Sequence, residues 1–307
     1  MPTNDPRQSK SQRRDEAREK ARALRIEQER KAKRNKIIAG TTIGVLVVAL
    51  VGAVVFTFMN KADTQAQYRD VAFAGSASGE VQAPAISDVK LPKTADQETG
   101  GVPVSDEGVG VTGDDDVVVS VFFDFMCPYC GLFDQANAAD LTTLAAEDGV
   151  TVLYRPVSFL DHMSRDTHYS TRAMNALGVV ADEDPEHVQA FITALYANQP
   201  KENTKGLSDD EIAKIATDLG VPAAVAAKFT DTVDGTFKVG DKEESGTWRV
   251  FAPWAAASTG QMAKETQVGT PKIFIDGKEW PGDGDSQLLY TQGALKQAVE
   301  DAVAAKG

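Results

Sequence analysis

The chain has 307 residues, of which 42% are apolar and 25% charged, with two cysteines and a net charge of −13. Two cysteines exclude a multi-disulfide scaffold, and 25 glycines and 13 prolines exclude a collagen-like or fully disordered chain. The charge is unevenly distributed, because residues 1–60 carry a net +7 and residues 61–307 a net −20. The net charge of the whole chain is therefore the sum of a basic and an acidic region, and it says nothing about binding to nucleic acid. No nucleic-acid partner is predicted.

Residues 37–59, IIAGTTIGVLVVALVGAVVFTFM, contain no charged residue. A helix of this length spans about 34 Å, enough for a hydrocarbon core of ~30 Å. We therefore predict a single N-terminal transmembrane helix over 37–59. The alternative is a cleaved secretory signal, whose apolar stretch is usually only ~7 to 15 residues long.

Thirteen Lys and Arg residues precede this segment. The positive-inside rule then predicts a basic cytoplasmic segment at 1–36 that contacts membrane lipid, and an extracytoplasmic location for everything after residue 59. The segment would act as a signal-anchor in the cell membrane, crossing it once. Residues 60–101 are rich in Ala, Gly, Ser, Gln, Asp and Thr without periodicity, and predict a flexible extracytoplasmic linker.

A nearly continuous apolar run, VVVSVFFDF at Val117–Phe125, predicts a strand that is buried on both faces. The sequence MCPYC follows, then a helical pattern that ends at Gly149, and then a second apolar strand at Val150–Pro156. The order is strand, CxxC, helix, strand. This order predicts an α/β domain with its cysteines at the start of a helix.

The position of the cysteines at the start of a helix explains why this motif is expected to be reactive. Cys127 at the edge of the helix would meet unpaired backbone amides and the positive end of the helix dipole, which favour thiolate over thiol. Pro128 suits the first helical position, where a missing N–H costs nothing. Cys130 lies on the same face and can close a disulfide. We expect an exposed nucleophile at Cys127 and a more buried resolving thiol at Cys130.

Two other uses of the cysteines are less well supported. A structural disulfide that closes a four-residue loop would stabilise by only about 2 kcal/mol, against ~4.7 kcal/mol for a loop of 100 residues. A zinc site would need ligands beyond the two cysteines, and the histidines at 162, 168 and 187 lack the spacing to supply them. We predict redox chemistry that needs no cofactor and no metal.

The motif FFDFMCPYC after a strand, with VGTP about 140 residues later, resembles the DsbA-like thiol-disulfide oxidoreductases of bacterial cell envelopes. The resemblance covers residues 102–307. It implies a thioredoxin-like fold with an inserted helical subdomain, and a cis-proline loop at Thr270–Pro271 that faces the cysteines. The backbone of Thr270 would pair there with an extended substrate segment.

Residues of about 160–265 form the predicted helical insertion. The expected helices are Arg165–Val180, Glu186–Ala197, Ser208–Leu219 and Val221–Thr230. Residues 231–252 fit no helical pattern and receive no assignment. After Pro271, a strand at Lys272–Ile275, a hairpin turn and a final helix over 286–306 complete the expected domain.

Two further positions, Tyr129 and Asp124, lie close to the cysteines in the sequence. Tyr129 stands between the cysteines where the DsbA archetype has His, and it offers at most an O–H donor in place of a positive charge. Asp124, three residues before Cys127, is a candidate proton acceptor that could tune the pKa of the pair. The alternative for Asp124 is a hydrogen-bonded polar residue at the end of a strand.

These observations predict an enzyme, a protein disulfide oxidoreductase that introduces disulfides into reduced, unfolded exported proteins. The resemblance implies re-oxidation by a membrane oxidase of the DsbB or vitamin-K-epoxide-reductase type. Two alternatives stay open. The same site could run as a reductase or isomerase, or the domain could be a non-catalytic, membrane-tethered binding or sensor module.

Overall fold

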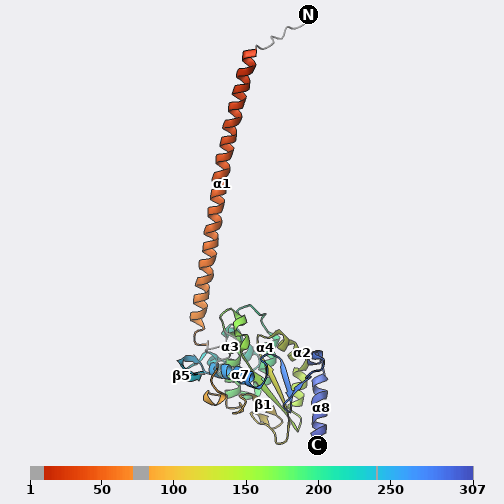
Figure 1. The fold of residues 1–307 in the computed structure, drawn as a ribbon. Helices are drawn as coiled ribbons and strands as arrows, with labels where there is room; N and C mark the ends of the chain where they lie inside the picture. Colours follow the sequence, from red (N-terminus) through yellow and green to blue (C-terminus); the bar gives the residue numbers. More distant parts are fainter. Residues whose placement is uncertain (1–9, 72–82, 240, 307) are drawn as a thin grey trace. The chain divides into compact units, whose positions relative to one another are not determined.

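The computed structural model describes residues 10–71, 83–239 and 241–306, and the chain divides into two units, Met1–Ala62 and Asp63–Gly307. The helices are α1 (Lys10–Gln67), α2 (Pro128–Leu144), α3 (Tyr169–Glu183), α4 (Val188–Ala197), α5 (Asp209–Asp218), α6 (Ala223–Ala226), α7 (Ala252–Glu265) and α8 (Ala294–Lys306) (Figure 1). The strands are β1 (Val102–Ser105), β2 (Gly108–Val109), β3 (Val117–Phe123), β4 (Val150–Pro156), β5 (Thr232–Val239), β6 (Lys242–Arg249), β7 (Lys272–Ile275) and β8 (Lys278–Trp280).

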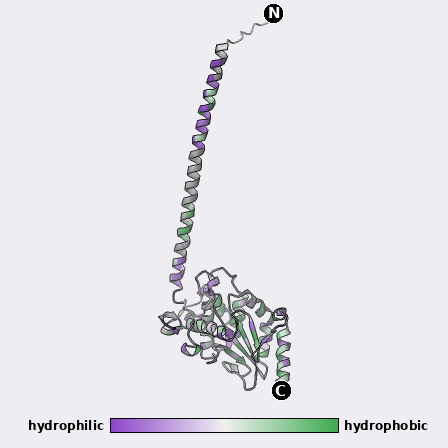
Figure 2. Cartoon of the chain, in the orientation of Figure 1, coloured by the Kyte–Doolittle hydropathy of each residue, from purple (hydrophilic) through white to green (hydrophobic). Residues whose placement is uncertain are grey.

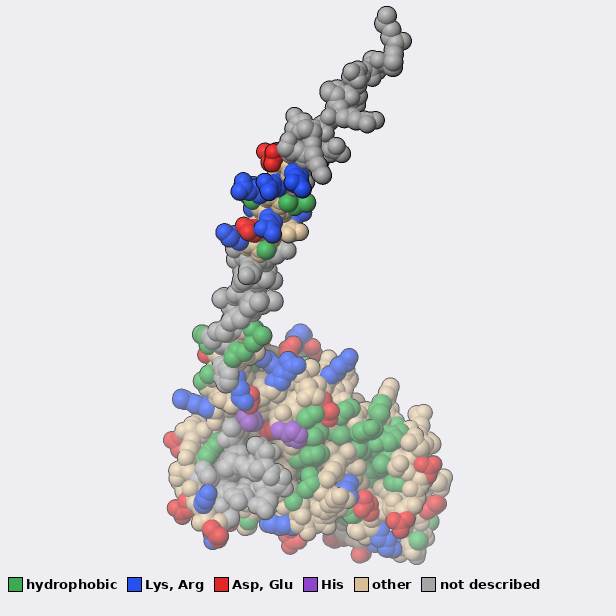
Figure 3. Space-filling model, turned by 45° about the horizontal axis from the view of Figure 1, so that its top comes forward, with side chains coloured by type: hydrophobic (Ala, Val, Ile, Leu, Met, Phe, Trp, Pro, Cys, Tyr) green, Lys and Arg blue, Asp and Glu red, His purple; other side chains and the backbone are tan. Residues whose placement is uncertain are grey.

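The helix α1 contains both the basic segment and the apolar segment of the sequence. The prediction of a transmembrane helix over 37–59 is wrong: among the residues that the structure describes, no helix is both long and apolar enough to cross a membrane. The apolar segment is part of one continuous 58-residue helix. The described N-terminal part of that helix is mostly hydrophilic in Figure 2, and Lys and Arg side chains cluster there in Figure 3.

The second unit is built on a six-stranded sheet with the order β2-β1-β4-β3-β7-β8. The two central strands, β3 and β4, run parallel, with Val121 opposite Tyr154, while β7 pairs antiparallel with β3. All seven residues of β4 and five of the seven in β3 are buried, which explains their nearly continuous apolar sequence. The parallel connection from β3 to β4 passes through α2, so the start of α2 lies at the end of the central strand.

The segment between β4 and β7 forms most of the additional structure. It contains α3 to α7, and α4 packs against α2 while α3 packs against α7. The capping box expected for the helix at 208–219 is present, since Ser208 and Glu211 exchange hydrogen bonds at the start of α5. The stretch that received no assignment is an antiparallel hairpin, β5–β6, in which Phe237 packs on Trp248.

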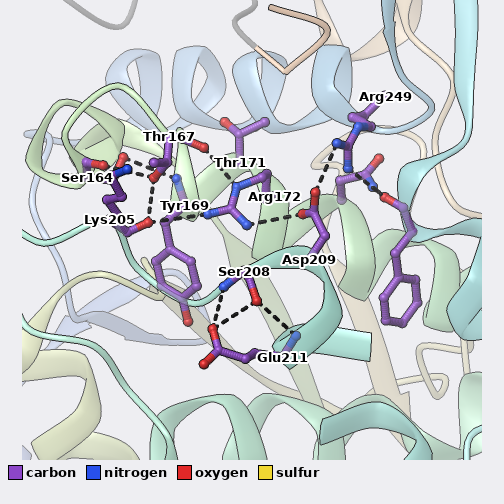
Figure 4. Close-up of polar contacts among 12 residues, drawn as sticks. Ser164, Thr167, Tyr169, Thr171, Arg172, Lys205, Ser208, Asp209, Glu211 and Arg249 are labelled. Carbon is purple, nitrogen blue, oxygen red and sulfur yellow. Dashed lines mark hydrogen bonds and ion pairs between the residues drawn. The ribbon is translucent and has the colours of Figure 1, made fainter. Parts of the chain in front are cut away.

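A buried ionic network holds the inserted segment together (Figure 4). Arg172 donates to Asp209 at 3.1 Å and to the carbonyl of Thr167 at 2.8 Å. Arg249 donates to the second oxygen of Asp209 at 3.1 Å and to Asp70 at 2.6 Å. Asp209 therefore bridges two buried guanidinium groups, from α3 and from the hairpin.

The region expected to be a flexible linker differs from that expectation where it is described. The side chains of Tyr68 and Val71 are buried, and Ile86 and Ala95 belong to the main core. Lys93 donates through its backbone N–H to Asp182 of α3 at 2.9 Å. Residues 72–82 lie outside the described part of the chain. Scattered apolar residues attach this segment to the core. They are too few to form a periodic pattern in the sequence.

Candidate active site

Cys127 occupies the N-cap of α2, directly after the central strand β3. Its backbone is extended and Pro128 follows at the first helical position, as the sequence predicted. The backbone N–H groups of Cys130 and Gly131 donate to the Cys127 carbonyl at 3.0 Å and 3.3 Å, which forms the first turn of α2. Both cysteines are free thiols. Contrary to the expectation of an exposed nucleophile, Cys127 is only 4% exposed and Cys130 1%.

The pKa values of the two thiols are shifted in opposite directions. The hydrogen bond from the Cys130 thiol is the largest influence that lowers the pKa of Cys127, to about 6, while burial opposes it. The Thr270 side chain and the backbone amides of Cys130 and Tyr129 lower this pKa further. Burial raises the pKa of Cys130 well above its ordinary value, and the hydrogen bond to Cys127 adds to the increase. The pair therefore combines a nucleophilic thiolate with a partner that stays protonated.

Thr270 and Pro271 lie beside the cysteines. The Thr270–Pro271 peptide is cis, as the family resemblance implied. The Cys127 thiol donates to the carbonyl oxygen of Thr270 over a distance of 3.3 Å. The loop that precedes β7 and the N-terminus of α2 thus share one site.

Asp124 is completely buried and accepts three hydrogen bonds. The donors are the backbone N–H of Met126 at 2.9 Å, the hydroxyl of Ser170 at 2.6 Å and the backbone N–H of Leu160 at 3.0 Å. Burial nevertheless raises the pKa of Asp124 to about 7, since the hydrogen bonds only partly offset the loss of solvation. The Asp124 backbone forms a hydrogen bond that acts on Cys130, so this carboxyl belongs to a segment in direct contact with the resolving thiol.

Four large apolar side chains are exposed on α2, just before the Thr270–Pro271 loop and in the turn that precedes α8. Tyr129 is 59% exposed and its ring lies 6.3 Å from the ring of Tyr290, while Leu132 is 51% exposed. Val268, just before the Thr270–Pro271 loop, and Leu288 are also more than one-third exposed. We call these four, Tyr129, Leu132, Val268 and Leu288, the apolar rim. Exposed apolar side chains around a reactive group are typical of a binding surface.

The inserted segment supplies contacts that the sequence did not indicate. The hydroxyl of Tyr196 donates to the Asp124 carbonyl at 3.2 Å, and the Gln199 amide donates to the carbonyls of Phe125 and Cys127. Ser170 reaches Asp124 from α3. No local pattern marks these residues, because the contacts depend on how α3 and α4 pack against the start of α2.

Neither cysteine belongs to a group of three close metal-ligating side chains among the residues that the structure describes. The arrangement fits redox chemistry: a low-pKa thiol at a helix N-terminus, a buried second thiol three residues later, and a proline loop opposite them.

Comparison with known proteins agrees with this geometry. The sequence profile of the thioredoxin family matches residues 111–288. MdbA, a thiol-disulfide oxidoreductase from Actinomyces oris, superposes with a TM-score of 0.53 at 20% identity, over 75% of this chain and 100% of that one. Reduced DsbA from Mycobacterium tuberculosis gives a TM-score of 0.46 at 21% identity, over 67% and 99% of the two chains.

A curated relative is the serine/threonine-protein kinase PknE of Mycobacterium tuberculosis, 35% identical over 113 residues. The match covers 35% of this chain and only 20% of the kinase.

The fold is that of thioredoxin, and its site places a CxxC pair at the start of a helix beside a cis-proline loop. The chain belongs to the thioredoxin family.

Proposed function

We propose that this protein introduces disulfides into reduced, unfolded exported proteins, outside the cytoplasm, through Cys127 and Cys130. The observation that carries the proposal is the Cys127 thiol at the N-cap of α2, with its pKa lowered to about 6 by the hydrogen bond from Cys130 and by nearby amides. At pH 7 a thiol of that pKa is roughly nine-tenths thiolate. A stabilised thiolate is a good leaving group, which favours donation of the disulfide.

The reaction begins with the Cys127–Cys130 disulfide. A substrate thiolate attacks the sulfur of Cys127, the Cys127–Cys130 bond breaks, and a mixed disulfide forms while Cys130 leaves as a thiolate and takes a proton. A second substrate thiolate then attacks the substrate sulfur, and Cys127 leaves as a thiolate. The substrate loses two electrons and the enzyme gains them as its dithiol. A membrane oxidase of the DsbB or vitamin-K-epoxide-reductase type would accept these electrons.

Substrate binding would use the Thr270–Pro271 loop. When Cys127 is a protonated thiol, its S–H donates to the Thr270 carbonyl. Neither the thiolate, which prevails at pH 7, nor a Cys127 in a disulfide has this proton, so the carbonyl is then available to the backbone of an extended substrate. The apolar rim favours chains that still expose apolar side chains, and unfolded proteins have that property.

Asp124 would tune this chemistry. Its buried carboxyl, with a pKa of about 7, can hold or release a proton near neutral pH, and its backbone contacts the resolving thiol. We propose that it acts as a proton acceptor for the pair when Cys130 must react as a thiolate.

An oxidative refolding assay tests the proposal. Full-length protein in the disulfide form should oxidise a reduced, unfolded substrate stoichiometrically, and Cys127→Ala should abolish this activity. If Cys127→Ala retained full cellular function, the protein would instead be a non-catalytic binding or sensor module. If the protein reduced disulfides better than it formed them, the reductase or isomerase alternative would hold.

A further inference from the structure

The end of α4 approaches the active-site turn through one side chain. Gln199, two residues after the end of α4, donates from Nε2 to the carbonyl of Phe125 at 3.0 Å and to the carbonyl of Cys127 at 2.8 Å. A primary amide has two N–H groups, so both can be used at once. These two carbonyls flank Met126 in the turn that leads from β3 into α2. Gln199 therefore connects the inserted segment to the backbone of the nucleophile.

Gly131 explains why the Gln199 side chain fits at this position. A Cβ placed on Gly131 would lie 2.4 Å from the Gln199 side-chain oxygen and 3.2 Å from its amide carbon. Gly131 lies in the first turn of α2 and does not have a positive φ, so its backbone conformation does not require glycine. The missing side chain provides space for the Gln199 amide.

The Cys127 carbonyl is also the first acceptor of α2, since it receives the N–H groups of Cys130 and Gly131. Its orientation is coupled to that of the first helical turn, whose amides at Tyr129 and Cys130 stabilise the Cys127 thiolate. A donor that fixes this carbonyl from outside the helix therefore also fixes where the sulfur lies relative to those amides.

We propose that Gln199 is a positioning residue for thiol-disulfide exchange, which holds the Cys127 backbone so that its sulfur stays over the first amides of α2, and that Gly131 keeps the space this requires. The inference rests on the proposed function, because it assigns a redox role to a contact at the same site. Through Gln199, the inserted segment then contributes to thiol-disulfide exchange.

The test compares Gln199→Met with Gly131→Ala in the full-length protein. Met keeps the length of the side chain without its donors, and Ala at 131 displaces the amide by contact. The first readout is the pH midpoint of thiolate absorbance in the reduced protein. The second is the equilibrium constant with glutathione. We expect both variants to raise the midpoint by roughly half a unit or more, and to make the disulfide less oxidising by about fivefold.

Gln189→Met is the matched control. Gln189 also extends from α4 toward the sheet, but its amide donates to the hydroxyl of Tyr154 at 3.0 Å, away from the cysteines. This variant should keep the wild-type midpoint and equilibrium constant. Because a helix-interior Ala is favoured over Gly, Gly131→Ala should shift the midpoint without loss of thermal stability.

The double variant Gly131→Ala/Gln199→Met should shift the midpoint no more than either single variant, since both act through one contact. Additive shifts, an unchanged midpoint in Gln199→Met, or an equal shift in Gln189→Met would each overturn the proposal. Thiolate absorbance does not depend on oxidase activity. A protein that failed to oxidise substrates but showed these shifts would therefore contradict the proposed function and leave the positioning role supported.

Discussion

The sulfur of Cys127 lies 3.3 Å from the carbonyl oxygen of Thr270, although 143 positions separate the two residues in the chain. The contact exists because β3, which leads to Cys127, pairs directly with β7, which follows the Thr270–Pro271 loop. The sheet thus brings a nucleophile and a backbone acceptor to the same place.

The first prediction concerns the order of the two cysteines. In Cys130→Ala the Cys127 thiolate should attack a disulfide-bonded substrate, releasing one substrate thiolate, and the resulting mixed disulfide should accumulate since the resolving thiol is missing. Non-reducing electrophoresis would detect them as bands that disappear with reductant. Cys127→Ala should form none, because the buried Cys130 has a raised pKa. Adducts of similar yield from both variants would contradict the assignment of roles.

The second prediction concerns Asp124. Its folded pKa is raised from 3.8 to about 7, so the folded state favours the protonated carboxyl. The stabilisation that this gives is complete below about pH 4 and is lost as the pH rises through about 7. Asp124→Asn stays neutral, so its free energy of unfolding should depend less on pH over this interval. Between pH 5 and pH 8 the free energy of unfolding should therefore fall less in the variant than in the wild type, by about 1 to 3 kcal/mol.

Urea unfolding at pH 5 and pH 8 would measure this difference. The same series can follow the rate of disulfide exchange against pH, where Asp124→Asn should lose an inflection near pH 7 if the carboxyl accepts a proton from the pair. A purely structural carboxyl would change the stability curve and leave the rate profile unchanged.

The third prediction concerns Arg249. Its buried guanidinium donates to Asp70, to Asp209 and to the carbonyl of Phe229. Arg249→Leu leaves these acceptors without their donor, and should lower the free energy of unfolding by about 3 kcal/mol. Backbone amides near Asp70 should then exchange faster with solvent. The exposed pair Lys214–Asp218 supplies the control, since Lys214→Ala should cost less than about 1 kcal/mol.

The fourth prediction concerns Tyr129, which is exposed beside the cysteines. Tyr129→His introduces a side chain that carries a positive charge when protonated, and this charge should lower the pKa of Cys127 below about 6 and make the disulfide more oxidising. Tyr129→Phe removes only the hydroxyl and should leave both quantities close to wild type. Equal effects of the two substitutions would show that the ring, and not the charge, controls the thiol.

The sequence predicted the site better than its surroundings. The strand before Cys127 and the proline at the first position of α2 follow from short motifs whose chemistry is local. The placement of Thr270–Pro271 opposite the cysteines was implied only by the family resemblance. The sequence also predicted a helix over 37–59, yet hydropathy alone did not distinguish a membrane span from part of the longer helix α1. The hairpin β5–β6 was unassigned because β6 is rich in polar and charged residues without apolar alternation, while the alternating positions of β5, from Val233 to Val239, are interrupted by Gly235.

Long-range packing explains the other differences between the sequence-based predictions and the structure. The burial of Cys127 and the contacts of Tyr196 and Gln199 arise because α4 packs against α2. These residues are 69 and 72 positions away from Cys127, and no local pattern encodes such a pairing. Burial raises the pKa of Asp124, and the hydrogen bonds from Ser170 and Leu160 of the inserted segment, which oppose that shift, are likewise long-range contacts.

The reduction potential of the Cys127–Cys130 pair tests the central claim most directly. Equilibration of the full-length protein with glutathione buffers would measure it. A Cys127 thiol with a pKa of about 6 predicts an oxidising couple, in the range of roughly −120 to −180 mV. A potential near or below about −270 mV, the value of thioredoxin, would contradict the assignment as a donor of disulfides.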